Sequence, residues 1–558
     1  MELDKQGLHF VPLGGSGEIG MNANLYHHQG KWLMIDLGIS FPDDSMPGVD
    51  VVLPDLSFIE ARKQDLLGIV LTHAHEDHFG AIPYLWERLG VPVYGTAFTL
   101  ALLRRKLAEA RQQITIPLHQ LDYNIDYQFG PFSVELVALS HSIPDPAALV
   151  LRTEAGTVLH TGDWKLDDTP MLGAKTDTDR LGEIGAEGVL ALVGDSTNAM
   201  VQGHTPSEKI ARAGLTEVIG AAKNRVAVTC FASNVARLDS IAAAARANDR
   251  ALCVVGRALH RTIAAAKESG YLADFPDLVP ETDFGLLPRE NIVIICTGSQ
   301  GEPRAAMARI AAGTHENIDL DPGDMVIYSS RQIPGNEPAI SKVQDRLVRR
   351  QIDLVTDEEA EVHVSGHPAR DELSELYRLV RPQIAIPVHG TARHLLAHAR
   401  LAESCQVPQA LIPDNGDIIS LSASEGARQI GHAPVGLLTH EGGEVMDIQS
   451  EQMRARRRML WNGTVTASLV LNAAGGLVLA PSVSQTGLCD GQSEADFLAD
   501  AALAIEDMLE EMNGRDKRSD ELLENGARAA LRGLARRRFG LRPTVHLHIM
   551  RADASEVG

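Results

Sequence analysis

Residues 68–78 combine an apolar strand with a dense set of metal-binding side chains, and this feature limits the fold more than any other. The apolar residues 68–71 lead into the pattern His-x-His-x-Asp-His over residues 73–78. A helix is expected just after His78, so the polar side chains crowd into one strand-to-helix turn. Two imidazoles two residues apart suit one metal ion, and the following Asp and His suit a neighbouring ion. The alternative is a histidine-rich surface loop that scavenges metal, which the specific spacing disfavours.

Three further candidate ligands, His141, Asp163 and His389, each lie just beyond the carboxyl end of an apolar strand. Functional groups collect at such positions in α/β folds. A lone His or Asp there is more often a capping or hydrogen-bonding residue, but with the motif these three complete a binuclear site. The sequence predicts one ion on His73, His75 and His141, a second on Asp77, His78 and His389, and Asp163 bridging the pair.

Two adjacent cations suit phosphodiester hydrolysis, because they generate hydroxide near neutral pH and stabilise charge on the attacked phosphate. Zinc suits the imidazole-rich ligand set best, and manganese is the alternative because two carboxylates contribute oxygen ligands. Asp36 is predicted to accept the second N–H of a ligand imidazole. An ordinary turn residue is the alternative for Asp36. His160 and His204 are predicted to be structural, since no ligand pattern surrounds them.

Length, charge and the N-terminus limit the class of protein. A chain of 558 residues is expected to form several domains, and no segment has the run of about 20 apolar residues that spans a bilayer. The first residues lack the features of a secretory signal, so we expect a cytoplasmic protein with no membrane partner. The 5 scattered cysteines predict buried thiols. A formal net charge of -23 means that any RNA binding must be local, with bound cations supplying much of the positive potential.

The metal-binding pattern resembles the metallo-β-lactamase superfamily. The resemblance rests on the motif at 73–78, His141, the Thr-Gly-Asp turn at 161–163 and Asp36. It implies an α/β fold in the form of a four-layer αβ/βα sandwich. Flavodiiron proteins carry Glu in place of the second His of the motif and perform redox chemistry, so His75 favours hydrolysis.

His389 lies about 226 residues beyond Asp163, so a whole domain must be inserted between these two ligands. This arrangement resembles the β-CASP nucleases, whose inserted domain carries an acidic residue, a His near its exit and a further His that returns to the metals. The matching residues are Asp195, His367 and His389. His367 is expected to hydrogen-bond the scissile phosphate or to protonate the leaving oxygen, with Asp195 fixing its tautomer. The alternative is that this pair only braces the two domains.

The pattern of expected elements places the boundaries of four regions. A β-rich first part gives way near Thr205 to alternating strands and helices, and a linker with a basic run precedes a small α/β tail. The predicted regions are residues 1–205 and 368–440 for the split metallo-β-lactamase domain, 206–367 for the β-CASP domain, 441–460 for the linker and 461–558 for the C-terminal α/β domain.

Within the β-CASP group, the match to the ribonuclease J family covers nearly the whole chain. It includes the segments 13–22, 231–234, 297–303 and 333–337. The resemblance implies 5′-to-3′ exonuclease activity with some endonuclease activity on RNA, in mRNA decay and rRNA maturation. The alternatives are a β-CASP DNA nuclease, a small-ester hydrolase of the glyoxalase type and a catalytically silent RNA-binding scaffold. The inserted domain counts against the ester hydrolase, and the full ligand set counts against the silent scaffold.

Two departures from the family pattern concern its metal sites. The family commonly has Glu-Tyr-Arg after the last ligand and its glycine, whereas this chain has Thr391-Ala392-Arg393, so contacts near the second ion are expected to differ. Some members bind a structural calcium ion through an aspartate near Asp50 and a second aspartate beyond the inserted domain. Asp50 is present, but the sequence does not identify its partner, so no calcium site is assigned.

Small polar turns supply the candidate phosphate-binding groups. Their backbone N–H groups and hydroxyls can bind phosphate without a cationic side chain, although ordinary loop chemistry is the alternative for any single turn. Because few Lys or Arg are expected beside these turns, we expect single-stranded RNA with a 5′-monophosphate to be preferred over a bulkier, more charged triphosphate. The candidate substrate-binding residues are Ser233, Asn234, His363, Val364, Ser365, Gly366 and His367.

The C-terminal tail is predicted to hold strands at 467–471 and 544–549 and helices at 494–512 and 519–538. The apolar spacing within residues 501–509 exceeds what a lone module of this size is expected to bury. We therefore predict that this helix lies at a subunit interface, in a homodimer or homotetramer formed through the C-terminal domain.

Overall fold

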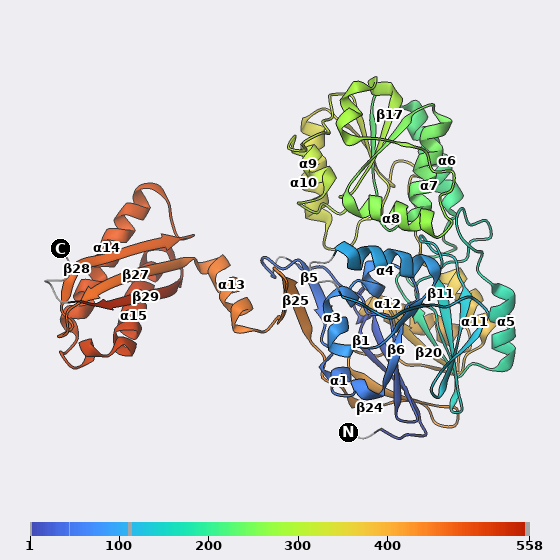
Figure 1. The fold of residues 1–558 in the computed structure, drawn as a ribbon, viewed down its shortest axis with the longest axis horizontal. Coiled ribbons are helices and arrows are strands. Elements are labelled where there is room, and N and C mark those ends of the chain that lie inside the picture. Colours follow the sequence, from blue (N-terminus) through green and yellow to red (C-terminus); the bar gives the residue numbers. More distant parts are fainter. Residues whose placement is uncertain (1–2, 44, 110–113, 553–558) are drawn as a thin grey trace. The chain divides into compact units, whose positions relative to one another are not determined.

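The structure is a computed structural model that describes residues 3–43, 45–109 and 114–552. It divides into two compact units: Met1–Ser40 with Val52–Leu437, and Phe41–Val51 with Leu438–Gly558. The first unit holds a two-sheet sandwich and an inserted domain, and the second holds a small α/β domain (Figure 1). Within the described residues, no helix combines the length and apolar character needed to cross a membrane.

The first sheet of the sandwich runs in the order β24-β23-β1-β3-β4-β6-β7-β8. The apolar residues 68–71, which predict a strand, lie in and directly after β6, so this prediction is confirmed. The strands are β1 (Leu8–Gly14), β3 (Ala23–His28), β4 (Lys31–Ile35), β6 (Leu66–Val70), β7 (Val93–Gly95), β8 (Leu118–Gln120), β23 (Asp417–Ser422) and β24 (Gly426–His432).

The second sheet runs in the order β22-β20-β13-β12-β11-β10-β9. Its central strands β12, β13 and β20 pair in parallel, so β20, which follows the inserted domain, lies beside β13, which precedes it. The strands are β9 (Asp126–Phe129), β10 (Phe132–Ala138), β11 (Ala147–Thr153), β12 (Gly156–His160), β13 (Ala191–Asp195), β20 (Ile384–Val388) and β22 (Gln409–Ala410).

The two sheets pack face to face around one apolar core. Leu149 and Leu151 of β11 point into this core with Phe10 of β1, while the intervening Val150 joins a second cluster with Ile184. Successive side chains of a strand face opposite sides of the sheet, so a strand covered on both faces is apolar throughout. This explains the uninterrupted apolar sequence of β11.

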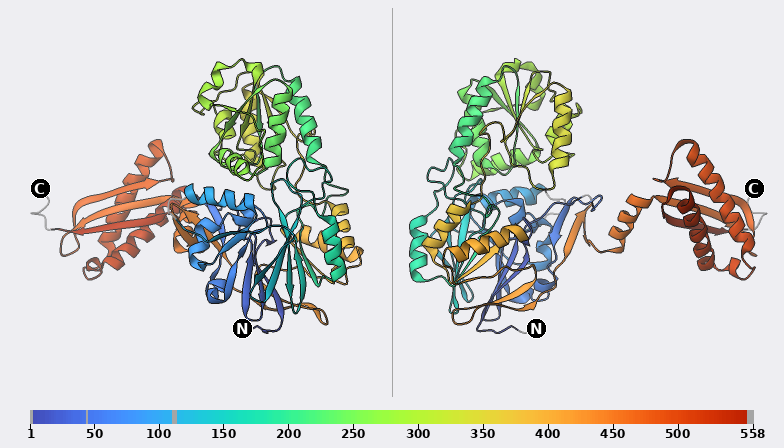
Figure 2. Two further views of the ribbon diagram at one scale, coloured as in Figure 1. Left: turned by 45° about the vertical axis from the view of Figure 1, so that its right-hand side comes forward. Right: turned by 180° about the vertical axis from the view of Figure 1, so that it is seen from behind.

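Helices cover the outer faces of both sheets (Figures 1 and 2). The α/β fold class and the four-layer αβ/βα sandwich expected from the resemblance are therefore confirmed. Beside the first sheet lie α1 (Ser57–Glu60), α3 (Ile82–Leu89) and α4 (Ala97–Glu109), and beside the second lie α5 (Thr178–Glu187), α11 (Arg370–Val380) and α12 (Ala392–Ser404).

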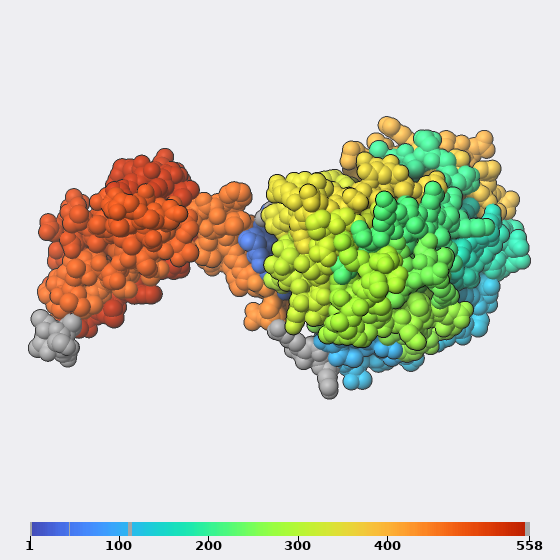
Figure 3. Space-filling view, turned by 90° about the horizontal axis from the view of Figure 1, so that it is seen from above, coloured from blue at the N-terminus to red at the C-terminus, as the bar shows by residue number. Residues whose placement is uncertain are grey.

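The inserted domain is a parallel sheet in the order β16-β15-β17-β14-β18-β19, with helices on its two faces. Figure 3 views its outer surface, drawn from green to yellow. The expected alternation of strand and helix is confirmed. The elements are α6 (Glu208–Ala221), β14 (Val226–Thr229), α7 (Val235–Ala247), β15 (Ala251–Val255), α8 (Arg257–Glu268), β16 (Leu278–Val279), β17 (Ile292–Cys296), α9 (Ala306–Ala311), β18 (Met325–Tyr328), α10 (Glu337–Arg349) and β19 (Asp353–Val355).

Residues 441–460, which the sequence predicts to be a linker, contain regular secondary structure. β25 (Leu437–Glu441) pairs with β26 (Glu444–Asp447), and α13 (Glu451–Asn462) contains the basic run. Ser450 caps α13 by accepting a hydrogen bond from the backbone N–H of Met453, whose side chain is buried. Arg is a good helix former, so a basic run behind a capping serine continues as a helix.

The C-terminal domain packs α14 (Gly491–Glu511) and α15 (Asp520–Phe539) on a sheet of order β28-β27-β29. Both helices and the strands β27 (Thr464–Leu471) and β29 (Thr544–Arg551) confirm the sequence predictions. The edge strand β28 (Leu477–Thr486) was not predicted, and Pro481 within it weakens the strand pattern, because proline occurs in sheets mainly at edges.

Apart from Leu503, the apolar stripe of α14 is buried within its own domain, so the expectation that this small domain could not bury the stripe is wrong for most of it. Phe497, Ala501 and Ile505 have no exposed surface, and Leu509 is 4% exposed. These residues pack against β27 and α15 in one apolar cluster. Leu503 is 56% exposed.

Candidate active site

The motif at residues 73–78 occupies the turn between β6 and the short helix α2 (Glu76–Phe79). The helix begins at Glu76, earlier than the expected start after His78. Backbone N–H groups from the chain after β4 fix the motif, because Leu37 donates to the carbonyl oxygen of His78 at 2.6 Å and Ile39 donates to that of Glu76 at 3.0 Å. The polar side chains therefore project from a rigid turn.

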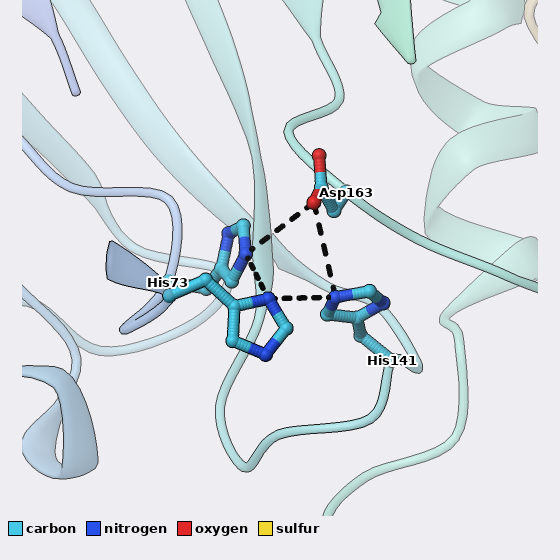
Figure 4. Close-up of side chains that lie close together, drawn as sticks. His73, His141 and Asp163 are labelled. Carbon is cyan, nitrogen blue, oxygen red and sulfur yellow. Dashed lines mark hydrogen bonds and ion pairs between the residues drawn. The ribbon is translucent and has the colours of Figure 1, made fainter. Parts of the chain in front are cut away.

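A first cluster of ligand atoms comes from the motif, from the loop after β10 and from the turn after β12. Nδ1 of His75 lies 3.1 Å from Nε2 of His73 and 3.1 Å from Nε2 of His141. Oδ2 of Asp163 lies 3.7 Å from Nε2 of His73 and 3.9 Å from Nε2 of His141. Figure 4 shows the rings of His73 and His141 turned toward Asp163.

A second cluster uses the other oxygen of Asp163. Oδ1 of Asp163 lies 3.3 Å from Nε2 of His78 and 3.8 Å from Nε2 of His389. Oδ2 of Asp77 lies 3.7 Å from each of these two nitrogens. In both clusters the ligand atoms all lie within 4.8 Å of one another. The structure thus brings together all seven predicted ligands, with Asp163 between the two groups.

The spacing and hydrogen bonding of these atoms fit metal ions. Ligands about 2.1 Å from a tetrahedral ion lie about 3.4 Å apart, which is the separation that both clusters approach. Oδ1 of Asp163 is buried and accepts no hydrogen bond from any described residue. A buried carboxylate oxygen without a partner is costly, whereas a bound cation satisfies it. The site is therefore able to hold divalent metal ions.

Burial keeps three imidazoles in the neutral form that binds metals. Desolvation lowers the pKa of His73 and of His141 well below the usual value, and it lowers the pKa of His75 to about 4. Burial favours the neutral form of Asp163 as well, but His389 and His78 outweigh it and hold the pKa of this carboxyl well below its usual range. Asp163 is thus ionised and able to bind cations.

Asp36 and Asn22 orient the imidazoles of the second cluster. Nδ1 of His78 donates to Oδ2 of Asp36 at 2.7 Å, as predicted for Asp36, so Nε2 of His78 faces the cluster. The side-chain amide of Asn22 lies 2.8 Å from Nδ1 of His389. No local sequence pattern predicts this role of Asn22, because its contact with His389 joins two segments that are far apart in the chain.

Backbone strain accompanies these two orienting contacts. Asp36 has φ of 61° and His389 has φ of 53°, in the left-handed region that non-glycine residues seldom adopt. The backbone N–H of His389 donates to the carbonyl oxygen of Gly15 at 2.6 Å. Strained residues of this kind cluster at functional sites, where the surrounding structure holds them.

The segment that returns from the inserted domain reaches the first cluster through Gly366. Its carbonyl oxygen accepts a hydrogen bond from Nδ1 of His141 at 2.6 Å. A carbonyl cannot donate, so Nδ1 of His141 carries the proton and Nε2 is free to bind a metal. A Cβ atom at residue 366 would lie 2.6 Å from Cε1 of His141, so only glycine fits here.

His367 and Asp195 form a pair beside the bridging aspartate. Nδ1 of His367 donates to Oδ2 of Asp195 at 2.7 Å and lies 3.9 Å from Oδ2 of Asp163. Asp195 also accepts a hydrogen bond from the backbone N–H of Thr197 at 2.8 Å, which fixes the carboxylate. Burial disfavours the charged ring of His367, but Asp195 and Asp163 outweigh it and raise its pKa to about 9.

Ser365 lies in a nearly closed pocket next to the first cluster. Its Oγ accepts hydrogen bonds from Asn198 Nδ2 at 2.9 Å and from the backbone N–H of His367 at 3.2 Å, so its own proton is free to donate. We call the cavity the Ser365 pocket; it holds about 10 Å³, and its lining includes His141, Ser142, Lys165, Ala236, Val364 and Ser365. A cavity of this size admits about one water molecule.

Lys165 is the one Lys or Arg among the residues that line the Ser365 pocket, and the acidic Asp167 and Glu208 line it as well, so the expectation of few Lys or Arg there is met. Lys165 lines the pocket, and Arg331 donates to Oδ1 of Asn198, the residue that bonds Ser365. Lys165 is only 3% exposed and is held by Asp167 and by the carbonyl oxygen of Pro206. Arg331 and Lys165 come from segments far from Ser365 in the chain, which is why local sequence did not reveal them.

The remaining candidate substrate residues have structural partners. Asn234 caps α7 by accepting from the backbone N–H of Arg237, and Ser233 precedes it at the same helix start. His363 accepts a hydrogen bond from the fully buried Arg237, and Val364 is buried in the Ser365 pocket. Ser233, Asn234 and His363 are not in the lining of that pocket, in contrast to Val364 and Ser365.

Other predicted features lie outside the two clusters. His160 is buried and bonds Tyr26 at 2.9 Å, and His204 is an exposed partner of Asp371. Among the described residues, no group of three or more potential ligands within 4.8 Å of one another includes Asp50 or a cysteine. Thr391 caps α12 together with His394, so it supports the helix next to His389.

Four family models match successive parts of this chain. They are described as "Metallo-beta-lactamase superfamily" (residues 17–202), "Ribonuclease J, beta-CASP domain" (223–347), "Zn-dependent metallo-hydrolase RNA specificity domain" (359–408) and "Ribonuclease J C-terminal domain" (451–552). Two of these models, for residues 223–347 and 451–552, are both described as parts of ribonuclease J.

Curated relatives match over almost the same length. Ribonuclease J of Sinorhizobium meliloti is 42% identical over 97% of this chain and 96% of the relative. Ribonuclease J of Mycolicibacterium smegmatis is 41% identical over 85% of each chain. A crystal structure of a protein of unknown function from Enterococcus faecalis V583 covers 74% of this chain and 100% of its own, with a TM-score of 0.52 and 18% identity, which supports the fold alone.

Proposed function

Because the chain belongs to the ribonuclease J family of metal-dependent nucleases, we propose that it hydrolyses single-stranded RNA by a two-metal-ion mechanism, as a 5′-to-3′ exonuclease with endonuclease activity. One observation carries the proposal. Two ligand clusters share the buried carboxylate of Asp163, and the pair His367–Asp195 stands beside them. Cytoplasmic mRNA decay and rRNA maturation are the proposed settings.

We assign one ion to His73, His75 and His141, the second to Asp77, His78 and His389, and the bridge to Asp163. When bound, the ions supply an activated water and stabilise charge on the phosphate. Zinc is the proposed metal because imidazole nitrogens predominate, and manganese is the alternative. Asp36, Asn22 and the carbonyl of Gly366 hold the imidazoles in the orientations that this requires.

His367 is the proposed proton donor to the leaving oxygen. Its Nδ1–H donates a hydrogen bond to Asp195. Nε2 is therefore available to hydrogen-bond the scissile phosphate or to protonate the leaving oxygen. Asp195 keeps the ring in this orientation through its second contact, with Thr197. The same pair also joins the returning segment to β13, so bracing the domains and donating a proton are compatible roles.

A 5′-monophosphate is the proposed terminal group of the substrate. The hydroxyl of Ser365 can donate to it, and Arg331, which bonds Asn198, supplies positive charge nearby, whereas the charge of Lys165 is offset by Asp167. Discrimination against a triphosphate then rests on size more than on charge, because the pocket holds only about 10 Å³ as it stands. Even a monophosphate requires the loops around Ser365 to move apart.

Cleavage assays on labelled nucleic acids test the proposal. Purified protein with zinc or manganese is incubated with one 5′-labelled sequence made as single-stranded RNA, double-stranded RNA and single-stranded DNA, with chelator as the control. Release of 5′-mononucleotides from single-stranded RNA is the expected result. Preferential cleavage of DNA would favour a β-CASP DNA nuclease, and binding of RNA without cleavage would favour a silent scaffold.

We also propose a division into regions and an oligomeric state. The regions are residues 1–205 with 368–440, 206–367, 441–460 and 461–558, and the last is proposed to join two or four copies of the chain. Because α14 buries most of its apolar stripe, the proposal rests on exposed side chains of the second unit: Leu479, Leu503 and Met550 are 49%, 56% and 51% exposed.

A further inference from the structure

A cavity of about 300 Å³ is lined by the chain around Glu18, and the proposed mechanism does not use it. We call it the Glu18 pocket. Its volume is at the lower end of cavities that hold small molecules, so it accommodates a group far larger than a water molecule. Its lining includes Leu13, Ser16, Glu18, Met21, Asn415 and Leu437.

The wall of this pocket is bonded to the last metal ligand in the chain. The strand β2 (Ser16–Gly17) pairs in parallel with β21 (Gly390–Thr391), which directly follows His389. The backbone N–H of His389 also donates to Gly15, the residue before β2. The chain that lines the Glu18 pocket is therefore bonded to the chain that carries His389 of the second cluster, whereas His141 of the first cluster lines the Ser365 pocket.

Two polar groups of this wall are incompletely hydrogen-bonded, and Glu18 is the one that a ligand can reach. Oε1 of Glu18 accepts hydrogen bonds from Asn415 Nδ2 at 2.7 Å and from the backbone N–H of Gly15 at 3.4 Å. Within the described part of the chain, Oε2 of Glu18 accepts no hydrogen bond. Oγ of Ser16 is buried and likewise has no partner among the described residues. The carboxylate is held in place at one oxygen and open at the other.

The remaining lining selects the chemistry of the ligand. Val435 and Leu437 are half-buried and offer apolar surface near the carboxylate, while Leu13 and Met21 lie buried behind the wall. A phosphate group would be repelled by Glu18. A nucleobase has apolar faces and polar edges, and proteins recognise single-stranded RNA by enclosing such faces and bonding such edges.

We propose that the Glu18 pocket holds the base of the nucleotide that follows the scissile phosphate, and that Glu18 selects bases with an exocyclic amino group there. This inference rests on the proposed function. In that proposal the 5′ nucleotide lies at the Ser365 pocket and its 3′ phosphate lies between the two clusters. The next nucleotide then extends toward the second cluster. A carboxylate only accepts hydrogen bonds, so it pairs with the N4 amino group of cytosine and not with the O4 carbonyl of uracil.

Kinetics on matched RNAs test this selection. Two 5′-monophosphorylated RNAs differ only in having C or U at the second position, and kcat/KM for release of the first nucleotide is measured with wild type, Glu18→Gln and the remote control Glu183→Gln. Wild type and control are expected to favour C by about five- to tenfold, the effect of one charge-assisted hydrogen bond at a partly exposed site. In Glu18→Gln the ratio is expected to fall to about one, because an amide both donates and accepts.

A modified RNA repeats the test without changing the protein. N4,N4-dimethylcytidine at the second position lacks the donor hydrogens and is expected to be cleaved as slowly as the U substrate by wild type. Equal rates on C and U in wild type would overturn the base selection, and an unchanged ratio in Glu18→Gln would overturn the role of Glu18. If wild type cleaved neither RNA, both the proposed function and this inference would fail. Cleavage of both RNAs at equal rates would instead overturn the inference alone.

Discussion

Nδ1 of His141 donates a 2.6 Å hydrogen bond to the carbonyl oxygen of Gly366, so a ligand of the first cluster is oriented by the segment that returns from the inserted domain. The orientation of this imidazole, and with it the position of Nε2, depends on where that segment lies. A displacement of residues 365–367 therefore changes both the Ser365 pocket and the metal site, which couples substrate binding to the geometry of the ligands.

Gly366→Ala tests this coupling. A Cβ atom at residue 366 would lie 2.6 Å from Cε1 and 2.7 Å from Nδ1 of His141, so either the ring or the backbone must move. We expect activity on RNA to fall about 100-fold, the cost of displacing a catalytic group by about 1 Å. Gly182→Ala is the control, because a Cβ atom there meets nothing within 4 Å. Similar activity in the two variants would show that His141 does not depend on Gly366.

Removal of a ligand should abolish activity while the fold persists. His75→Ala is expected to lower the content of one metal, and Asp163→Asn that of both, because Asp163 faces both clusters. Loss of activity on the order of 100-fold or more is expected for each variant. Metal analysis, RNA cleavage and circular dichroism are the measurements. Full metal content with near-normal cleavage in either variant would refute the ligand assignment.

His367→Ala should separate catalysis from metal binding. If His367 donates a proton, kcat is expected to fall by about 10²- to 10⁴-fold, while metal content and KM stay close to wild type. Asp195→Asn is expected to show a smaller loss of kcat, since the ring keeps its place but loses its charged partner. A rise in KM with unchanged kcat in His367→Ala would assign the pair to bracing alone.

The Ser365 pocket should determine the preference for the 5′ end. Rates are compared on one RNA with a 5′-monophosphate, a 5′-triphosphate or a 5′-hydroxyl, in wild type, Ser365→Ala and Arg331→Ala. Wild type is expected to prefer the monophosphate, and each variant to raise KM for it about tenfold, as expected when a hydrogen bond or charge next to a phosphate is lost. Equal rates on the three ends in wild type would show that the pocket does not recognise the terminus.

Truncation after Asn462 should reduce the mass of the assembled protein. This variant lacks α14, α15 and the exposed Leu479, Leu503 and Met550. Multi-angle light scattering is expected to give a multimer for the full chain and a smaller species for the truncated chain, whose thermal unfolding should still be cooperative. An unchanged number of copies would place the subunit contact elsewhere.

The sequence predicted best what depends on local pattern. Each of the seven candidate ligands follows an apolar strand, and strands that share a sheet edge bring their following residues together, as His141, Asp163 and His389 illustrate. Contacts between distant segments could not be predicted in this way. Asn22 beside His389, and Lys165 and Arg331 beside Ser365, depend on the packing of segments that no local pattern relates.

Errors in the C-terminal domain also have physical causes. The error concerns what covers the apolar stripe of α14, because such a pattern shows that one face is buried but not which element buries it. β27 and α15 supply enough apolar surface to cover it within the domain. The strand β28 escaped prediction because its alternation is interrupted by Pro481 at the edge of the sheet.

The parallel pairing of β13 with β20 has a consequence for the nascent chain. β20 lies between β13 and β22 in the second sheet, and His389 follows it directly, so neither the sheet nor the second cluster can close until the whole inserted domain has left the ribosome. Pairing of strands so distant in sequence is slow, because a long loop must close first. The metal site of the growing polypeptide therefore stays incomplete at least until His389 has been translated.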